Sequence, residues 1–324
     1  MEIQKKHRAK IIIGTVVVFV VLAVFFFRKI DFQQVGKTLS SLNPQYLALA
    51  FLFNALQVLF WILRPWPLVP KDKTLSFKVL AKAVSVGQFL NSFAPARAGD
   101  VAKVYILSSA KTENSLTPSN AIGLLATDKI LDLLSIVCIA FFSGAMAFQS
   151  QESNSSSIAL YVVGAIVLIG VIGFFVISEK IKAKIKVWIQ EFLFGMRPLL
   201  SPKAALPSLA FAFCVWICEA LAIQMVLYSA NFPLEFTKCI YIMCIVNLGV
   251  MVPLSVANIG AFEAAFSYGV SKFGIGVSDA LALAFAHHLL QAGAMTLWAL
   301  CTFRLGGKLN LKTKVMKANE VGIQ

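Results

Sequence analysis

Two apolar stretches of this chain, Val86–Tyr105 and Val246–Phe266, are interrupted by proline, glycine and charged residues. Both interruptions hold residue types that can bind an anion or a proton. Backbone freed from helical hydrogen bonds in so apolar a chain needs polar partners, which lipid does not offer. Interrupted helices of this kind therefore predict a polar site or pathway inside the protein.

The first interruption has the chemistry of a phosphate site, and its candidate residues are Asn91, Pro95, Arg97, Gly99, Asp100 and Lys103. Pro95 removes a backbone donor and Gly99 permits positive φ, so we expect helical order to lapse between them. A helix that restarts near Asp100 would direct free N–H groups at the break. Arg97 and Lys103, beside the break and outside the packed core, would add positive charge for a phosphate. The alternative is an ordinary cytoplasmic loop with snorkelling bases.

The second interruption carries Asn247, Pro253, Asn258, Gly260 and Glu263. Glu263 comes one turn after Gly260, near the start of a new helix, where a carboxylate has a structural role as a cap. Its apolar surroundings also make it a candidate proton or cation site.

Three charged residues, Asp128, Lys129 and Asp132, lie far inside another apolar run. Asp128 and Asp132 are four residues apart and share a helix face. Charges at such depth usually face a polar interior with partners. They form either an internal ion-pair cluster that holds the bundle together or a direct contact for substrate, and both interpretations stay open.

Three further ionisable residues, Glu219, His287 and His288, lie in the middle of apolar runs. Adjacent histidines on a helix point about 100° apart and do not readily share a metal ion, so we expect a hydrogen-bonded core role for at least one. The sequence has no Walker loop, GxGxxG motif or metal-spaced Cys/His cluster, so neither a cofactor nor a metal is expected. The cysteines lack CxxC pairs and are expected to be small core residues: Cys138, Cys214, Cys218, Cys239, Cys244 and Cys301.

The elements that must position these residues are membrane helices. Hydrophobic residues make up 59% of the chain and charged residues 14%, with a mean hydropathy of +0.80, which excludes an ordinary soluble protein. Several apolar runs approach the roughly 20 residues that cross a bilayer, so the predicted fold class is all-α, a polytopic helical bundle. The 29 Lys and Arg against 15 Asp and Glu cluster between apolar runs, which indicates membrane topology and no nucleic-acid partner.

Six full spans are expected, at about 11–27, 46–63, 120–148, 158–177, 207–229 and 278–304, with the interrupted segments at 79–110 and 237–274 as re-entrant hairpins. No cleavage site follows the first run, so we expect it to remain as a span. Basic residues place both termini in the cytoplasm, together with the connection that holds Arg64, Lys71, Lys73, Lys78 and Lys82. The connection Gln149–Ser157 has no Lys or Arg and is expected outside.

The whole chain, 1–324, is expected to be one integral membrane domain. Two halves, about 30–177 and 205–305, are joined by a cytoplasmic amphipathic linker at 178–206 and followed by a basic cytoplasmic tail at 306–324. Adding about 160 to positions in the first half brings Asn91 close to Asn247, Pro95 to Pro253 and Gly99 to Gly260. This weak match suggests an inverted repeat, a plan in which transporters place the substrate site near the midplane.

At these same residues the chain resembles the lysylphosphatidylglycerol synthase transmembrane region and flippase-like family, over about 40–305. The most specific stretches are NSFAPARAGDVAKVYIL with TDKILDLL, and VPLSVANIGAFEAAF with AFAHHLL. The family's usual first motif is N-x-x-x-P-x-R-x-G-E-x-x-R, in which Asp100 stands for Glu and Lys103 for Arg. Asp128 and Lys129 replace a Glu-Arg pair. Of the second motif, P-G-G-x-G-x-x-E, only Gly260 and Glu263 match, and His288 falls where Arg is usual.

The resemblance implies a lipid-handling protein of the cytoplasmic membrane. Its characterised branch moves an aminoacylated phospholipid from the inner to the outer leaflet, and other members are associated with polyprenyl-phosphate or glycolipid pathways. The chain lacks the large soluble domain that makes the aminoacyl lipid, so we expect a lipid translocase or lipid-binding transporter. The alternatives are a membrane-embedded transferase with Asp100, Asp128 or Glu263 as base, and a partner of lipid-synthesis or glycosyltransferase enzymes. The resemblance also predicts a polar pair of Glu263 and His288 that gates the cavity, because 25 residues accommodate one helix, a turn and the start of the next.

Overall fold

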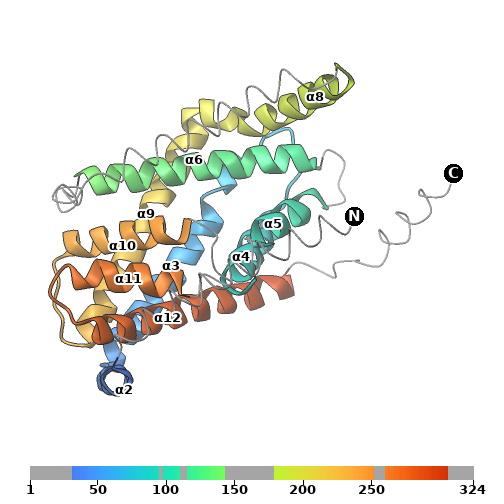
Figure 1. Ribbon diagram of the computed structural model, residues 1–324. Helices are drawn as coiled ribbons and strands as arrows, with labels where there is room; N and C mark the ends of the chain where they lie inside the picture. The colour runs from blue at the N-terminus through green and yellow to red at the C-terminus, as the bar shows by residue number, and fades with distance from the viewer. Residues whose placement is uncertain (1–30, 95–97, 110–114, 143–178, 252–259, 306–324) are drawn as a thin grey trace, which may run out of the picture.

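The computed structural model describes residues 31–94, 98–109, 115–142, 179–251 and 260–305, and these ranges form ten α-helices (Figure 1). The predicted all-α fold class is confirmed for these ranges. The expected spans at 11–27 and 158–177 and the connection Gln149–Ser157 lie outside the described residues. So do the C-terminal tail and four of the candidate site residues, Pro95, Arg97, Pro253 and Asn258.

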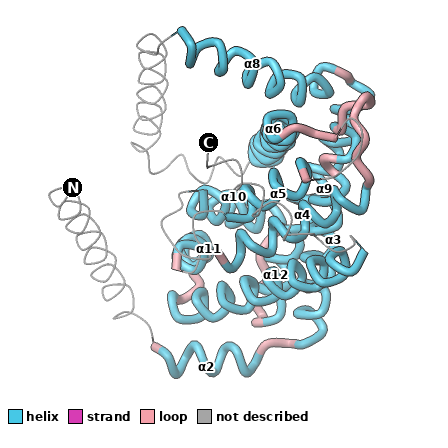
Figure 2. Tube along the Cα trace, turned by 90° about the vertical axis from the view of Figure 1, so that its right-hand side faces the viewer, coloured by secondary structure: helices cyan, strands magenta, loops and turns pink. Residues whose placement is uncertain are grey.

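The first described helix, α2 (Phe32–Ser41), was not expected from the sequence. The side chain of Asp31 caps it by accepting hydrogen bonds from the next turn, at 2.9 and 3.2 Å. The helix lies across the start of α12 (Val277–Leu305), where the Asp31 N–H donates to Ser278 Oγ at 3.0 Å. α2 and α8 (Glu179–Met196) lie at opposite ends of the bundle in both views (Figures 1 and 2).

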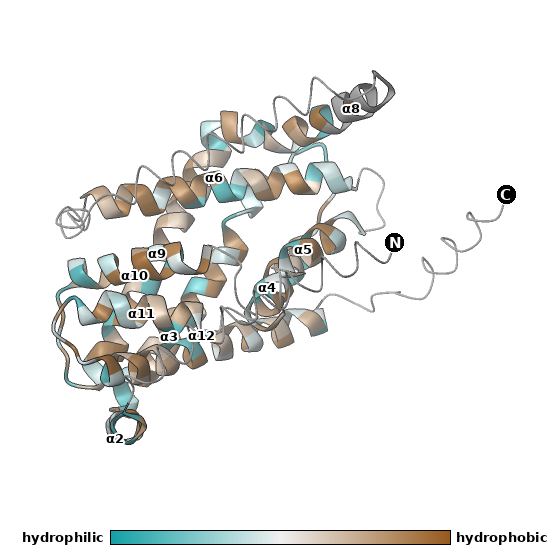
Figure 3. Ribbon diagram, viewed as in Figure 1, coloured by the Kyte–Doolittle hydropathy of each residue, from teal (hydrophilic) through white to brown (hydrophobic). Residues whose placement is uncertain are grey.

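Three long apolar helices can cross a membrane by length and composition: α3 (Pro44–Leu63), α9 (Pro202–Ser229) and α12. Two of them match the expected spans closely, and apolar residues cover most of their length (Figure 3). α9 starts earlier than predicted, because Pro202 opens its first turn and Pro207 lies within the helix. α6 (Pro118–Phe142) is similarly long but carries the three charged residues in its middle.

Both interrupted segments fold as antiparallel helical hairpins. The first consists of α4 (Phe77–Phe93) and α5 (Ala98–Ser108), and the second of α10 (Phe236–Met251) and α11 (Ala261–Ser271). Ala94 has extended backbone, as the proline that follows it requires. The predicted hairpins are confirmed as helix pairs in the described residues.

The hydrophobic core has two main parts. One is built by α9 to α12, around Ile223, Met243 and Phe266, and the other mainly by α3 to α6, around Ile62, Leu107 and Leu124. α3 and α9 join the two parts and run antiparallel, since the Asn43 N–H donates to the Ser229 carbonyl at 2.8 Å.

The expected linker contains α8 and the 3₁₀ turn η4 (Arg197–Leu200); a second 3₁₀ turn, η1 (Trp66–Leu68), follows α3. α8 packs on the first half of α6, where Gly195 and Gly123 let the two backbones approach closely. The Asn120 side chain donates to the Glu191 carbonyl at 2.8 Å. The linker helix is thus fixed to the bundle through α6.

Candidate functional site

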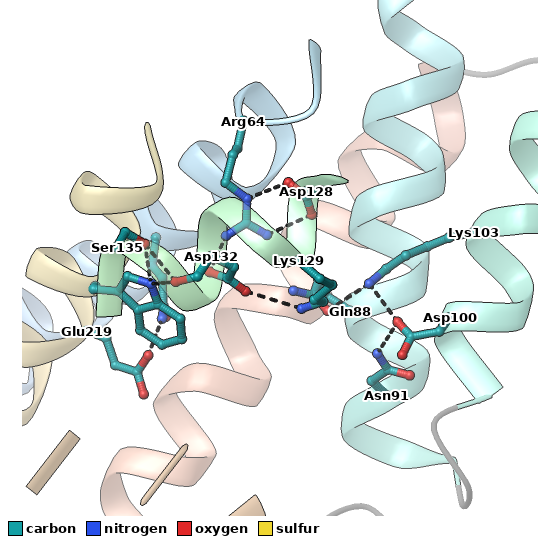
Figure 4. A network of polar contacts seen from close by, with 12 residues as sticks. Arg64, Gln88, Asn91, Asp100, Lys103, Asp128, Lys129, Asp132, Ser135 and Glu219 are labelled. Carbon is teal, nitrogen blue, oxygen red and sulfur yellow. Dashed lines mark hydrogen bonds and ion pairs between the residues drawn. The ribbon is translucent and has the colours of Figure 1, made fainter. Parts of the chain in front are cut away.

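An arginine at the end of α3 binds the two aspartates of α6. Arg64 donates from Nε and Nη2 to the two carboxylate oxygens of Asp128, at 2.6 and 2.8 Å, and from Nη1 to Asp132. All three residues are buried, and Arg64 is only 2% exposed. Figure 4 shows the guanidinium between the two carboxylates. The internal ion-pair cluster, one of the two interpretations of these aspartates, is therefore present.

The expectation that Arg64 lies in a cytoplasmic connection is wrong, because Arg64 is buried. Two buried carboxylates need a counter-charge, and the end of α3 supplies it inside the bundle. Lys82, counted in the same connection, is also buried, and its Nζ lies 4.5 Å from the centroid of the Phe303 ring.

Lys129 extends the Arg64 cluster to the outside of the bundle. Its Nζ lies 3.3 Å from Asp132 Oδ2, and its side chain is 50% exposed. The same side of α6 exposes a row of large apolar residues, Ile130, Leu133, Leu134, Val137 and Phe141. Such a face in a membrane protein meets lipid, so Lys129 presents a positive charge beside an apolar surface.

The first interruption forms a second polar cluster between α4 and α5, in which Lys103 is buried and Asp100 is partly exposed. Lys103 Nζ lies 3.0 Å from Asp100 Oδ1 and 3.3 Å from Gln88 Oε1, and Asn91 Nδ2 donates to Asp100 Oδ1 at 3.1 Å. Lys103 is buried, so the expectation that it lies outside the packed core is wrong. The reason is the carboxylate of Asp100, which compensates a cation inside the hairpin.

Gly99 has a different role from the one predicted. It lies within α5 at ordinary helical φ, since among the described glycines only Gly260 and Gly274 have positive φ. A Cβ on Gly99 would overlap the carbonyl oxygen of Gly87. Gly99 is therefore a close-packing residue, and the helical break lies before it.

The two clusters are neighbours. Lys129 interacts electrostatically with both Asp100 and Lys103, and Figure 4 shows the charged groups in one continuous row. The row contains three cations and three carboxylates: Arg64, Lys103, Lys129, Asp100, Asp128 and Asp132. Of the three cations in this row, Lys129 is exposed, whereas Arg64 and Lys103 are buried.

The second interruption separates into two sites. Glu263 Oε2 accepts the Gly260 N–H at 2.6 Å, and Glu263 Oε1 lies 2.6 Å from His288 Nδ1. Both the cap and the pair with His288 were predicted, and both are confirmed. The His287 ring packs against the rings of both Phe262 and Phe266, at 5.8 Å from each ring centroid, and those two centroids are 6.1 Å apart. Of the two histidines, His288 has the hydrogen-bonded role.

Asn247 belongs to a different cluster, with Glu219 in α9. Asn247 Nδ2 donates to Glu219 Oε1 at 3.0 Å, and Gln57 Nε2 donates to Glu219 Oε2 at 2.8 Å. One turn earlier in α9, Trp216 Nε1 donates to Ser135 Oγ at 3.0 Å and to the Asp132 carbonyl at 3.2 Å. The tryptophan thus connects this cluster to the Arg64 cluster.

Sequence reasoning missed Arg64, Gln57 and Gln88 as members of these clusters. Gln57 and Gln88 are isolated amides in apolar runs, which is a signal that could have identified them. Within the described ranges, no three His, Cys, Asp or Glu residues are arranged to hold a metal ion. All six cysteines are free thiols, but only Cys218 and Cys239 are fully buried, so the expectation of core positions is wrong for the exposed Cys301.

The sequence is similar to one protein family and to two known proteins. A family model described as the lysylphosphatidylglycerol synthase TM region matches residues 11–299. The chain is 24% identical over 222 residues to a UPF0104 membrane protein of Methanocaldococcus jannaschii, a match that covers 66% of this chain and 93% of that protein. It is 19% identical over 361 aligned positions to the glycosyltransferase AglD of Haloferax volcanii, which covers 97% of this chain but 57% of AglD.

Proposed function

Because the chain belongs to the lysylphosphatidylglycerol synthase transmembrane region family, we propose that it is a flippase-like lipid translocase of the cytoplasmic membrane. Its substrate is an anionic or modified phospholipid or a polyprenyl-phosphate-linked lipid. The observation that carries the proposal is Lys129, a half-exposed cation on the apolar outer face of α6.

The position of Lys129 along α6 supports this role. It comes eleven residues after Pro118, which is roughly 16 Å along the helix at ~1.5 Å per residue. Its partner Asp132 binds Arg64 at the end of α3, so the charge of Lys129 lies toward the end of that span. Lys129 already pairs with Asp132, and its half-exposed charge beside an apolar face can also attract a lipid phosphate. A lipid phosphate at Lys129 would leave its acyl chains along the exposed apolar row.

The buried charges next to Lys129 have a distinct role in this proposal. Arg64 and Lys103 are already paired with carboxylates, so they orient the site and keep it rigid. Arg97, beside the break in the same hairpin, is proposed to supply a second contact for the phosphate. Asn91 and Asp100, the polar candidates beside Lys103, are proposed to line the path of the head group, and the pair of Glu263 and His288 to gate it.

An inverted repeat is part of the proposal, and two observations support it. Gln57 and Glu219, which hydrogen-bond where α3 and α9 cross, are 162 residues apart. Adding the same 162 to Gly87, Gly99 and Lys103 gives Gly249, Ala261 and Ala265. Gly87 packs against Gly99 and Lys103, and Gly249 packs in the same way against Ala261 and Ala265. Two halves related in this way can rock about a shared site and expose it to each leaflet in turn.

The test is movement of fluorescent lipids in vesicles that contain the purified full-length chain. Labelled phosphatidylglycerol, a labelled polyprenyl phosphate and zwitterionic phosphatidylcholine are each followed by quenching of the outer leaflet. We expect an anionic lipid to lose protection faster than in protein-free vesicles, and phosphatidylcholine to remain at the protein-free rate. Equal rates for all lipids, with and without protein, would rule out translocation.

A second candidate function is a membrane-embedded transferase or an accessory subunit of a glycosyltransferase. The relationship to AglD, which is named a glycosyltransferase, favours it. The chain spans little more than half of the length of AglD, so this activity is a proposal for the present chain. Formation of a glycosylated lipid by the pure protein from a lipid-linked sugar donor would support the transferase over the translocase.

A further inference from the structure

We propose that Glu219, together with Gln57 and Asn247, forms an intramembrane proton site at the crossing of α3 and α9. Its role in transport rests on the proposed lipid translocation, whereas proton binding can be tested without it. The site differs in its chemistry from the row of charged residues that contains Lys129, because its ligand is a proton and the partners of Glu219 are neutral amides.

The first argument is that Glu219 has no counter-charge among the residues that the structure describes. Asp128 and Asp132 are paired with Arg64, and Glu263 is paired with His288. Glu219 is only 3% exposed, and its hydrogen-bond partners are the side chains of Gln57 and Asn247. No basic side chain in the described ranges is within ion-pair distance of it. A carboxylate buried without a cation favours the neutral, protonated form.

The second argument is that the cluster has a shortage of donors. Gln57 Oε1 is buried and accepts no hydrogen bond. The same is true of Asn54 Oδ1, one turn away on α3. In the ionised state, both amides donate to Glu219. In the protonated state, the Gln57 amide can turn over and accept the new carboxyl proton through Oε1. One added proton therefore supplies a donor that the cluster lacks.

The same geometry disfavours a metal ion. Amide N–H groups, which repel a cation, occupy both carboxylate oxygens at 2.8 and 3.0 Å. Sodium or a divalent ion would need several oxygen ligands in place of these donors. A proton needs one acceptor, which Gln57 provides.

The titratable neighbours of Glu219 come from two helices. Asp132 on α6 and Cys244 on α10 interact with it electrostatically. The negative charge of Asp132 repels an ionised Glu219 and so acts in the same direction as burial. α3 and α12 also pack against α9, and in the described residues they bring no ionised group to hydrogen-bonding distance of Glu219.

The location of the site explains how protonation would act on transport. Glu219 and Gln57 hydrogen-bond across the contact between the two halves of the chain. Adding or removing a proton changes which of them donates, and therefore how α3 and α9 pack. Proton uptake on one side of the membrane and release on the other would then favour successive arrangements of the two halves.

Infrared difference spectroscopy between acidic and alkaline conditions tests proton binding in the reconstituted full-length chain. We expect a protonated carboxyl band that is present in wild type, shifted in D₂O and absent from Glu219→Gln. The matched control is Glu235→Gln, which alters an exposed carboxyl and should retain the band. Gln57→Leu keeps the carboxyl but removes its acceptor, and should move the band to higher frequency. A band that is unchanged in both Glu219→Gln and Gln57→Leu would overturn the proton site.

Two further measurements separate the possible outcomes. An imposed pH gradient should accelerate lipid translocation by wild type, and the ratio of rates with and without the gradient should fall to one in Glu219→Gln. Lipid movement with the same ratio in both proteins would overturn coupling and leave translocation intact. If no lipid moves, the translocase proposal fails and the infrared band alone decides the proton site. Thermal stabilisation of wild type but not Glu219→Gln by sodium, compared with choline, would assign the site to sodium and refute the proton.

Discussion

Gly99 of α5 packs directly on the backbone of Gly87 of α4, so closely that a methyl group on Gly99 would overlap the Gly87 carbonyl oxygen. The side chain of Lys103 also lies against Gly87, which likewise has no room for a Cβ. Small residues at this contact bring Asp100 and Lys103 within reach of Asn91 and Gln88. The geometry of the charged cluster therefore depends on two glycines that carry no charge.

Substitution of Gly99 by alanine should destabilise the protein by about 1–3 kcal/mol, the usual effect of adding atoms to a packed interior. The measurement is thermal unfolding of the purified protein in detergent. Gly36→Ala in α2 is the matched control, because a Cβ there meets nothing within 4 Å. It should be neutral or slightly stabilising. Equal melting temperatures for both variants would show that the α4–α5 contact is not tight.

Substitution of Arg64 by leucine should destabilise the protein by about 3–5 kcal/mol, because it leaves the buried Asp128 without a counter-charge and Asp132 with only the half-exposed Lys129. Adding Asp128→Asn and Asp132→Asn to Arg64→Leu should recover much of this loss. The control is Lys238→Leu, which removes a partly exposed pair with Glu235 at 3.6 Å and should change stability by less than about 1 kcal/mol. A small effect of Arg64→Leu alone would mean that water reaches the aspartates.

Local sequence signals predicted the fold better than the partners of its charges. Pro95 and Gly260 mark the two hairpins because proline and glycine act on the backbone of their own segment. The pair of Glu263 and His288 was predictable because the two residues lie on consecutive helices. Arg64 is separated from Asp128 by a whole hairpin, and Gln57 from Glu219 by half of the chain. Such contacts depend on how distant helices pack, which periodicity and composition do not specify.

Substitution of Lys129 by glutamine should weaken retention and translocation of an anionic lipid about tenfold or more. The variant removes one charge-assisted contact, which contributes about 1.5–3 kcal/mol. Lys238→Gln is the control, because Lys238 also pairs with a carboxylate three residues away. The measurement is lipid retained by the purified protein, together with transport in vesicles. Equal losses in the two variants would indicate a general effect of surface charge and would remove Lys129 from the site.

Substitution of His288 by arginine should make transport less sensitive to pH near neutrality. In wild type, the contact with Glu263 is an ion pair only while His288 is protonated. Arginine keeps its charge and therefore the pair. Glu263, Phe262 and the neighbouring His287 are the groups that face His288 in the described residues. Transport in vesicles is measured across the neutral range for wild type, Glu263→Gln and His288→Arg. If wild type and His288→Arg share one pH profile, the pair does not gate transport.

Cysteine labelling should place Lys71 and Glu235 on opposite sides of the membrane. α3 and α9 run antiparallel, with the start of α3 next to the end of α9. Lys71 follows the end of α3 and Glu235 follows the end of α9, so the two exposed positions lie at opposite ends of this helix pair. From the neighbouring basic residues we expect Lys71 on the cytoplasmic side.

In a background without the six native cysteines, an impermeant maleimide added to intact cells should label Glu235→Cys. Lys71→Cys should react only after the membrane is opened. Labelling of both positions from the same side would be incompatible with α3 and α9 as full antiparallel spans, and so with the inverted repeat. If Lys71→Cys alone reacts from outside, the repeat is retained and the orientation is reversed, because the basic connection after α3 would then face the exterior.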